Sequence, residues 1–462
     1  MERLETDYLV VGAGASGLSF TDALVAESDA DVLMVDRRER VGGHWNHAYE
    51  FLRLHIPSAN YGVNSLPLGA DTLDDEGLYE RASGPEVRDY FHRVFDEQLL
   101  PTGQVRFLGD CEYLDGDDGR HRVCMADGTV MDVSVRRKLV DTRYMGTDLP
   151  GLHTPSFTID PGVRLVPVGA LTGGLDDHDR FVVLGSGKTA IDACGYLLDS
   201  GVEPGRITWV RPRDQWLLDR ASLQPLDQVG SIIEGFALDL DAAANAESVE
   251  DLFARLEDSG RLLRIDPAVT PTMYRCAIVT RRELEQLHSI EDVVRLGRVR
   301  HIGERTITLD DGTVATSPQT LHVDCTANGL HVAPPQRIFE EGRITIQQVR
   351  PCSPVFNPAL IGYVEATRDD VAEQNRLCPP IANPDTPTSW LHNLAAMAQL
   401  PMLWTDPDLV AWLERSRLNI VRGRLDHLDD PRITQSAERN KRNYVAAADN
   451  LKAFLREPVA AG

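Results

Sequence analysis

The sequence lacks the features that would tie the protein to a membrane, a metal ion or a nucleic acid. Its 462 residues contain no apolar run near the roughly 20 residues that cross a bilayer. Its net charge of −24 opposes binding to nucleic acids and to anionic membranes. No His, Cys or Asp cluster has metal-ligand spacing, and no strand–turn–helix pattern carries G-x-S-x-G. We therefore exclude these classes, while the length allows two or three domains with full cores.

Cysteine is scarce, with seven residues scattered along the chain and no C-x-x-C pair. This usage is typical of a reducing compartment and predicts a cytoplasmic protein. A disulfide reductase would need a redox-active cysteine pair early in the chain, and no cysteine precedes Cys111, so this class is excluded. Because the first strand-like run begins within the first ten residues, we also expect no signal or transit peptide.

A glycine-rich segment near the start of the chain predicts a dinucleotide-binding turn. An apolar run from Asp7 leads into G-x-G-x-x-G at Gly12, Gly14 and Gly17, and a helical pattern and a second strand pattern follow, ending at Asp36. The glycines permit a tight turn, close approach of a pyrophosphate and close packing of the helix, whose N-terminus favours phosphate. A carboxylate at Asp36 suits ribose hydroxyls and repels a 2′-phosphate. This site is therefore predicted to bind FAD or NAD rather than NADP.

A second copy of the motif lies in the middle of the chain, in RFVVLGSGKTAIDACGYLLDSG. Its glycines are Gly185 and Gly187, with Ala190 at the third position. The next strand pattern ends in Arg211 and Arg213 instead of a carboxylate. A guanidinium group suits the 2′-phosphate of NADPH because it can form two parallel charged hydrogen bonds. We therefore predict an NADPH site here, the alternative being that both arginines are solvated groups at a strand end.

A repeated sequence pattern indicates that the two motifs belong to two related domains. MADGTVMDVSVRRKLVDT and TLDDGTVATSPQTLHVDCT each contain an Asp-Gly hairpin signal and then a strand that ends in Asp and Thr. We predict an α/β fold of two Rossmann-like domains, the second inserted in the first near Pro150 and Cys325, each with a β-meander. The expected ranges are 1–155 and 321–386 for the FAD domain, 156–320 for the NADPH domain and 387–462 for a helical C-terminal region.

Several segments between about residues 5 and 330 together resemble the flavin-containing monooxygenases, which are class B flavoprotein monooxygenases. These segments are GGHW, LRLHIPSANYGVNSLPLG, GSGKTAIDA, VRPRDQWLLDR and VDCTANGL. The resemblance implies FAD in the first domain and NADPH in the second. It also implies a set of cofactor-binding residues. The set is Gly12, Gly14, Ala15, Ser16, Gly17, Asp36, Arg37, Gly43, His44, Trp45, His55, Asn64, Thr142, Gly185, Gly187, Lys188, Thr189, Arg211, Arg213, Asn328 and Gly329.

The expected catalytic residue is His55, which aligns with a family Asn that lies beside the reactive flavin carbon. It is expected to donate a hydrogen bond to bound oxygen or to act as a general acid and base. The alternative is a histidine whose ring is satisfied by backbone contacts. His44 is expected to pack near the flavin, and His153, in the segment that crosses between the domains, is a further candidate for the active site.

The chain also departs from the family. The family fingerprint Phe-x-Gly-x-x-x-His, which helps to couple NADPH binding to oxygen chemistry, reads DPGVRLV from Asp160 to Val166, and Arg143 replaces a family glycine. The leading prediction is a single-component monooxygenase that oxygenates a small organic substrate with O2 through a flavin C4a-hydroperoxide. The alternatives are an NADPH-dependent flavin reductase or dehydrogenase without oxygen activation, and a degenerate FAD-binding protein that is not an enzyme. The sequence leaves the substrate open, and a homo-oligomer is one option for assembly.

Overall fold

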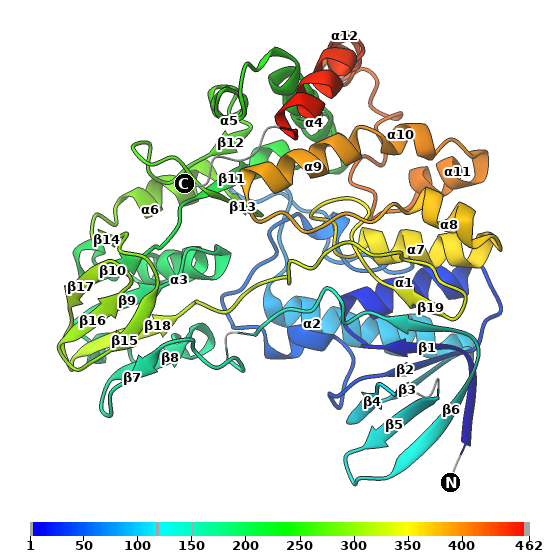
Figure 1. Cartoon of the computed structure of the whole chain (residues 1–462), viewed down its shortest axis with the longest axis horizontal. Helices are drawn as coiled ribbons and strands as arrows, with labels where there is room; N and C mark the ends of the chain where they lie inside the picture. The colour runs from blue at the N-terminus through cyan, green and yellow to red at the C-terminus, as the bar shows by residue number, and fades with distance from the viewer. Residues whose placement is uncertain (1–2, 117–119, 150, 457–462) are drawn as a thin grey trace.

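The computed structural model describes residues 3–116, 120–149 and 151–456, and its first domain is built on a mixed sheet (Figure 1). The strand order is β3-β2-β1-β6-β5-β4, with β19 also paired to β6. Strands β3, β2, β1, β6 and β19 run parallel, whereas β4, β5 and β6 form an antiparallel meander. The strands are β1 (Arg3–Val11), β2 (Val32–Val35), β3 (Val105–Leu108), β4 (Cys111–Leu114), β5 (His121–Met125), β6 (Val130–Asp141) and β19 (Arg343–Thr345).

Both faces of this sheet are buried, which explains the continuous apolar run in β1. Tyr8 and Val10 point into a core shared with helices α1 (Ala15–Ala26), α2 (Gly84–Arg93) and α7 (Phe356–Thr367). Leu9 and Val11 point to the opposite face, where the meander covers them. Because successive side chains of a strand point to opposite faces, one apolar segment contributes residues to two hydrophobic cores.

The second domain has a parallel sheet of its own, with the strand order β14-β10-β9-β18-β8. Its meander lies in a separate sheet, β17-β16-β15-β7, and a third sheet has the order β12-β11-β13. The strands are β7 (Thr158–Ile159), β8 (Arg164–Pro167), β9 (Arg180–Leu184), β10 (Ile207–Val210), β11 (Gln215–Asp219), β12 (Leu262–Leu263), β13 (Met273–Val279), β14 (Val293–Val294), β15 (Val299–Ile302), β16 (Thr306–Leu309), β17 (Gly312–Ala315) and β18 (Thr320–Asp324). Its helices are α3 (Lys188–Asp199), α4 (Gly230–Asn245), α5 (Val249–Asp258) and α6 (Arg281–His288).

The predicted fold class is confirmed, including the inserted second domain and the two hairpins. Asp127 and Gly128 lie between β5 and β6, and Asp310 and Asp311 connect β16 to β17, which begins at Gly312. In the first domain, the last meander strand continues as the closing strand, β6. In the second domain, the last meander strand (β17) and the closing strand (β18) are separate and belong to different sheets.

The domain boundaries follow from the sheets to which the strands belong. Because β18 lies inside the second sheet, a boundary at residue 321 would split it. We propose that the second domain ends after Asp324 and that the chain rejoins the first sheet at β19. The expected exit from the first domain at Pro150 lies outside the described residues.

The predicted helical C-terminal region is also confirmed, and it contacts both domains (Figure 1). Trp404 and Trp412 pack in the core of the first domain, while Trp390 packs in a core of the second. The helices that follow the second sheet, besides α7, are α8 (Val371–Leu377), α9 (Pro387–Met397), α10 (Leu400–Leu403), α11 (Pro407–Arg415) and α12 (Pro431–Phe454). Helix α12 packs along α4. None of the helices in the described ranges is both long and apolar enough to cross a bilayer.

A buried ion pair joins α4 to the chain that follows α5, and it generates a prediction about stability. Arg261 Nε and Nη2 each donate to the Asp239 carboxylate at 2.9 Å. We expect Asp239→Ala to lower the free energy of unfolding by about 3–5 kcal/mol, because it leaves a buried guanidinium without its partner. Glu97→Ala, which breaks an exposed pair with Arg93, should cost far less, because solvent screens that pair. Urea unfolding followed by circular dichroism measures both, and equal losses would contradict the prediction.

Candidate active site

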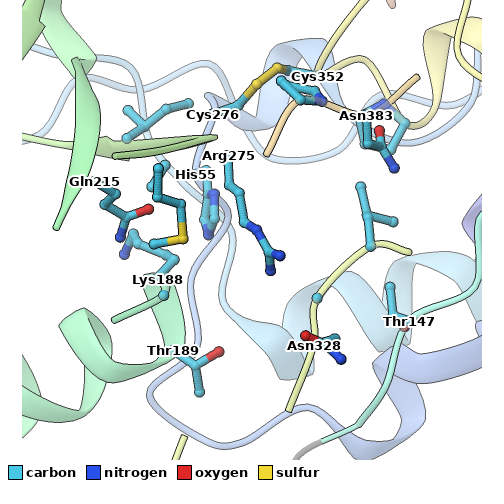
Figure 2. Close-up of a pocket in the computed structure, with 18 of the residues that line it drawn as sticks. His55, Thr147, Lys188, Thr189, Gln215, Arg275, Cys276, Asn328, Cys352 and Asn383 are labelled. Atoms are coloured by element: carbon cyan, nitrogen blue, oxygen red, sulfur yellow. A yellow bond between two sulfur atoms is a disulfide. The ribbon is translucent and has the colours of Figure 1, made fainter. Parts of the chain in front are cut away.

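A cavity of about 1120 Å³ lies between the two domains and under the C-terminal region. Its walls include His44 and Trp45 from the first domain and residues of the second glycine turn. His55 of the first domain lies near Lys188 and Thr189, which follow that turn (Figure 2). Asp385 and Trp390, from the segment that begins the C-terminal region, also line it. The cavity therefore brings together parts of the chain that lie far apart in the sequence.

The first glycine turn has the geometry of a phosphate cradle. Gly12 has a φ of +104°, and a Cβ there would stand 2.3 Å from the Thr142 hydroxyl oxygen. Gly14, which is followed in α1 by Ala15 and Ser16, would place a Cβ 3.4 Å from the Cα of Gly43. Within the described chain, no side chain caps the N-terminus of α1. Its first amide groups are therefore free to bind an anion, so these residues fit the pyrophosphate of a dinucleotide.

Asp36 lies beside this turn, at the end of β2, as the motif predicts. Its carboxylate accepts from the N–H of Ala13 at 2.8 Å and from the N–H of Arg38 at 2.9 Å. Two other residues are predicted cofactor contacts: Arg37, which follows Asp36, is exposed, and Asn64 Oδ1 accepts from the Ser416 hydroxyl at 2.9 Å. The roles of all these residues toward a cofactor stay predictions.

The second glycine turn repeats the geometry of the first, and it borders the cavity. Gly185 has a φ of +130°, and a Cβ there would stand 2.5 Å from the Cys325 carbonyl oxygen. Gly187 precedes α3, and no described atom would lie within 4 Å of a Cβ placed on it. In the part of the chain that the structure describes, α3 also has no capping side chain. The turn therefore offers space and free amides for a second phosphate group, next to Lys188 and Thr189.

Among the described helices, α1 and α3 are two of those that begin without a capping side chain; α4, α7, α10 and α11 also lack one. Several other helices begin with a side chain that accepts a hydrogen bond from their first turn. These capping residues are Ser83, Ser248, Thr280, Asp370, Thr386 and Asp430. At α1 and α3 the N-cap residue is a glycine, Gly14 or Gly187, so no side chain stands where a ligand could accept from the first amides.

The two arginines expected to bind a 2′-phosphate have different environments. Arg211 is 2 % exposed, pairs with Asp214 at 2.9 Å and lies over the Trp209 ring, and this burial lowers its pKa. Arg213 borders the cavity and pairs with Asp385 at 3.3 Å. Of the two, Arg213 is therefore the one placed to meet a ligand.

Three histidines line the cavity. Burial within the wall lowers the pKa of His55 to about 3, with Lys188 and Arg81 adding like charge, and it lowers the pKa of His44 to about 4. His153 Nε2 lies 2.9 Å from an Asp324 carboxylate oxygen, which joins it to the end of β18. At neutral pH, His55 therefore offers the cavity an uncharged imidazole, with one donor and one acceptor nitrogen.

Several cavity residues were not predicted from the sequence. Arg275 extends into the cavity (Figure 2), and its Nε donates to Asp385 at 2.5 Å. It lies in a β-bulge, because the pairing of β11 with β13 passes from Tyr274 directly to Ala277. A bulge can re-aim side chains in this way, and the sequence carries no signal for it. Asn328 and Gly329, which were predicted, also border the cavity.

Two of the scattered cysteines are paired in the folded protein. Cys276 and Cys352 form a disulfide across 76 residues of sequence, and both border the cavity. Sequence spacing could not reveal this pair, because the fold and not the local chain brings the two residues together. Among the described residues, no group of three or more His, Cys, Asp or Glu side chains is placed to hold a metal ion.

Comparison with known proteins agrees with this architecture. Residues 10–73 match the family model described as an NAD(P)-binding Rossmann-like domain. Uncharacterized proteins of Mycobacterium tuberculosis and Mycobacterium bovis are 45% identical over 441 residues, covering 94% of this chain and 81% of theirs.

Solved structures of two monooxygenases are similar in fold. A cyclohexanone monooxygenase in an open form has a TM-score of 0.50 at 14% identity, with 81% of this chain and 92% of that chain covered. An oxidized steroid monooxygenase bound to NADP has a TM-score of 0.50 at 16% identity, with 97% and 98% covered. At such identities the likeness shows the fold, which is that of these two-domain monooxygenases.

The environment of His55 generates a prediction about its titration. Because its pKa lies near 3 in the folded protein, its imidazole should stay neutral between pH 8 and about 5. The unfolded chain takes up this proton at a higher pH, near 6.5. Stability should therefore decline as the pH falls below about 6.5, and should decline less in His55→Gln. NMR of histidine-labelled protein, with His55→Gln to assign the signal, measures the titration, and a midpoint near 6.5 would contradict the assigned environment.

Proposed function

We propose that this chain, which belongs to the same family as the mycobacterial proteins, is an FAD- and NADPH-dependent monooxygenase. It would transfer one oxygen atom from O2 to a small organic substrate in the cavity between its domains. The observation that carries this proposal is the pair of uncapped glycine turns, Gly12–Gly17 and Gly185–Gly187. The second turn borders the cavity, and the first lies against Gly43, which precedes His44 of the cavity wall. The monooxygenases with the same fold, one of them with NADP bound, support it.

Each cofactor would be held by residues whose geometry fits it. The amides of the first turn of α1 would bind the pyrophosphate of FAD, with Asp36 available to the ribose. The amides that follow Gly187 would bind the pyrophosphate of NADPH, and Arg213 its 2′-phosphate. The flavin supplies the electron transfer to oxygen when it is bound, while the protein supplies binding, orientation and exclusion of water.

His55 would act in the cavity as a neutral hydrogen-bonding group. Because its imidazole carries no charge at neutral pH, it can donate one proton in a hydrogen bond to an oxygen atom without adding positive charge. The apolar part of the cavity wall, which includes Trp45, Ile232 and Phe236, would keep bulk water from the reacting groups. Water exclusion favours oxygen transfer to the substrate over release of peroxide.

A second candidate is an NADPH-dependent reductase or dehydrogenase that does not activate oxygen. It is favoured by the segment from Asp160 to Val166. Where the family has an aromatic residue and a histidine, this chain has Asp160 and Val166. Here the segment connects β7 to β8, and Asp160 approaches His301 at 3.4 Å. The cytoplasmic location stays a prediction from cysteine usage.

The proposed function predicts the fate of the electrons from NADPH. The purified protein should release FAD on denaturation, and with its substrate class it should form one oxygenated product for each NADPH consumed. A panel of ketones, sulfides and amines, assayed for product, NADPH and H2O2, measures this coupling. His55→Ala should divert electrons to H2O2, His55→Asn should retain more coupling than Ala, and His288→Ala, an exposed site on α6, should match the wild type. If H2O2 accounts for all NADPH with every class, the reductase is favoured.

The different positions of the two arginines predict how each affects the electron donor. A charged hydrogen bond contributes roughly 1.5–3 kcal/mol, so Arg213→Ala should raise the KM for NADPH by about tenfold or more and leave NADH nearly unchanged. Arg211→Ala should mainly lower thermal stability, because Arg211 is buried against Asp214 and Trp209. Steady-state kinetics with both donors tests this. If Arg213→Ala has the same KM values for NADPH and NADH as the wild type, the 2′-phosphate site lies elsewhere.

A further inference from the structure

Two cysteines meet in the wall of the cavity. Cys276 belongs to β13, Cys352 lies between β19 and α7, and their sulfur atoms are bonded with the Cα atoms 6.2 Å apart (Figure 2). This separation is within the range of native disulfides, about 4.4–6.8 Å. Both side chains are half-buried and border the cavity, so a small reagent that enters the cavity can reach them.

The backbone at both cysteines has an unusual conformation. Among the described residues, five that are not glycine have a positive φ, and Cys276 and Cys352, each at 56°, are two of them. A side chain disfavours this left-handed region, so such residues persist where the surroundings hold them. At Cys276 the conformation coincides with the bulge in β13. The disulfide is therefore positioned to hold that bulge in place.

The disulfide also joins the two domains. Strand β13 is part of the second domain, whereas the segment with Cys352 leads into α7, which packs against α1 of the first domain. Arg275, next to Cys276 in the bulge, extends into the cavity (Figure 2). A change at the sulfur atoms would thus act on the contact between the domains and on the position of a charged cavity residue.

We propose that Cys276 and Cys352 are a reversible redox pair, a modification site at which the disulfide locks the β13 bulge and the domain contact and the dithiol releases them. Hydrogen peroxide is the oxidant. One thiolate attacks a peroxide oxygen to give a sulfenic acid and one water, and the second thiolate attacks that sulfur and releases the second water. Two electrons pass from the two thiols to one peroxide molecule. A small thiol or dithiol reverses the bond by two exchange steps.

The remaining cysteines are consistent with this assignment. Cys111, Cys194, Cys325 and Cys378 are buried free thiols, and burial raises the pKa of each, which keeps it protonated and unreactive. Disulfides in a reducing cytoplasm are usually transient and redox-sensing, so a reversible pair fits the compartment expected from the sequence. If the proposed function holds, peroxide released in the cavity would reach this pair directly.

Thiol mapping tests the chemistry. Full-length protein is reduced with dithiothreitol, desalted, treated with H2O2, then denatured and alkylated for mass spectrometry. We expect a loss of two thiols, a linked peptide that contains Cys276 and Cys352, and full recovery with dithiothreitol. Cys276→Ser and Cys352→Ser should abolish the link, while Cys124→Ser, which removes a free and half-buried thiol, should retain it. Seven alkylated thiols, a link through another cysteine, or irreversible oxidation of Cys276 would overturn the proposal.

Hydrogen exchange tests the lock. In the wild type, the backbone amides of Met273–Val279 and of residues 346–355 should exchange faster in the dithiol form than in the disulfide form, and the melting temperature should fall by several degrees. Cys276→Ser should show no such difference between oxidised and reduced samples. Equal exchange in the disulfide and dithiol forms of the wild type would contradict the proposal that the disulfide holds the β13 bulge and the domain contact. Neither measurement uses NADPH or flavin, so failure here and failure of the proposed monooxygenase are separate results.

Discussion

The two glycine turns depend on places where backbone approaches backbone so closely that no side chain fits. A Cβ on Gly17 would stand 2.0 Å from the Gly12 carbonyl oxygen, and one on Gly185 would stand 2.5 Å from that of Cys325. These contacts let α1 and α3 start directly at the carboxyl ends of their strands. The amides of both helices therefore point toward the region where a parallel sheet binds its ligands. Both proposed cofactor sites follow from this constraint, and the second of them forms part of the cavity wall.

A second determinant is a segment outside both dinucleotide motifs. Asp385 accepts from Arg213 and from Arg275, and its carbonyl accepts from the Tyr274 N–H at 3.0 Å. The Tyr274 ring stacks on Trp390 with centroids 4.6 Å apart. The start of the C-terminal region therefore closes the cavity and neutralises part of its positive charge. In a protein of net charge −24, the arginines gathered here make a local basic site that suits an anionic cofactor.

Local patterns in the sequence predicted local structure well. The glycine turns, the Asp-Gly hairpins and Asp36 at the end of β2 lie where the motifs place them, because each depends on residues close together in the chain. The sequence predicted less well which of two nearby residues on a strand is buried and which one faces the cavity. Arg211 and Arg213 share one strand end, yet one is buried against Asp214 and the other borders the cavity. The sequence pattern does not contain the packing that separates them.

The sequence by itself determined two dinucleotide-binding motifs, their insertion order and the helical end of the chain, because glycine conformation and strand or helix periodicity are properties of short segments. Tertiary structure alone decided the shape and chemistry of the cavity. The bulge that turns Arg275 inward, the bond between Cys276 and Cys352, and the burial that keeps His55 uncharged all arise from contacts between segments distant in sequence. Such contacts depend on how the two domains and the C-terminal region pack together, and no local pattern records that packing.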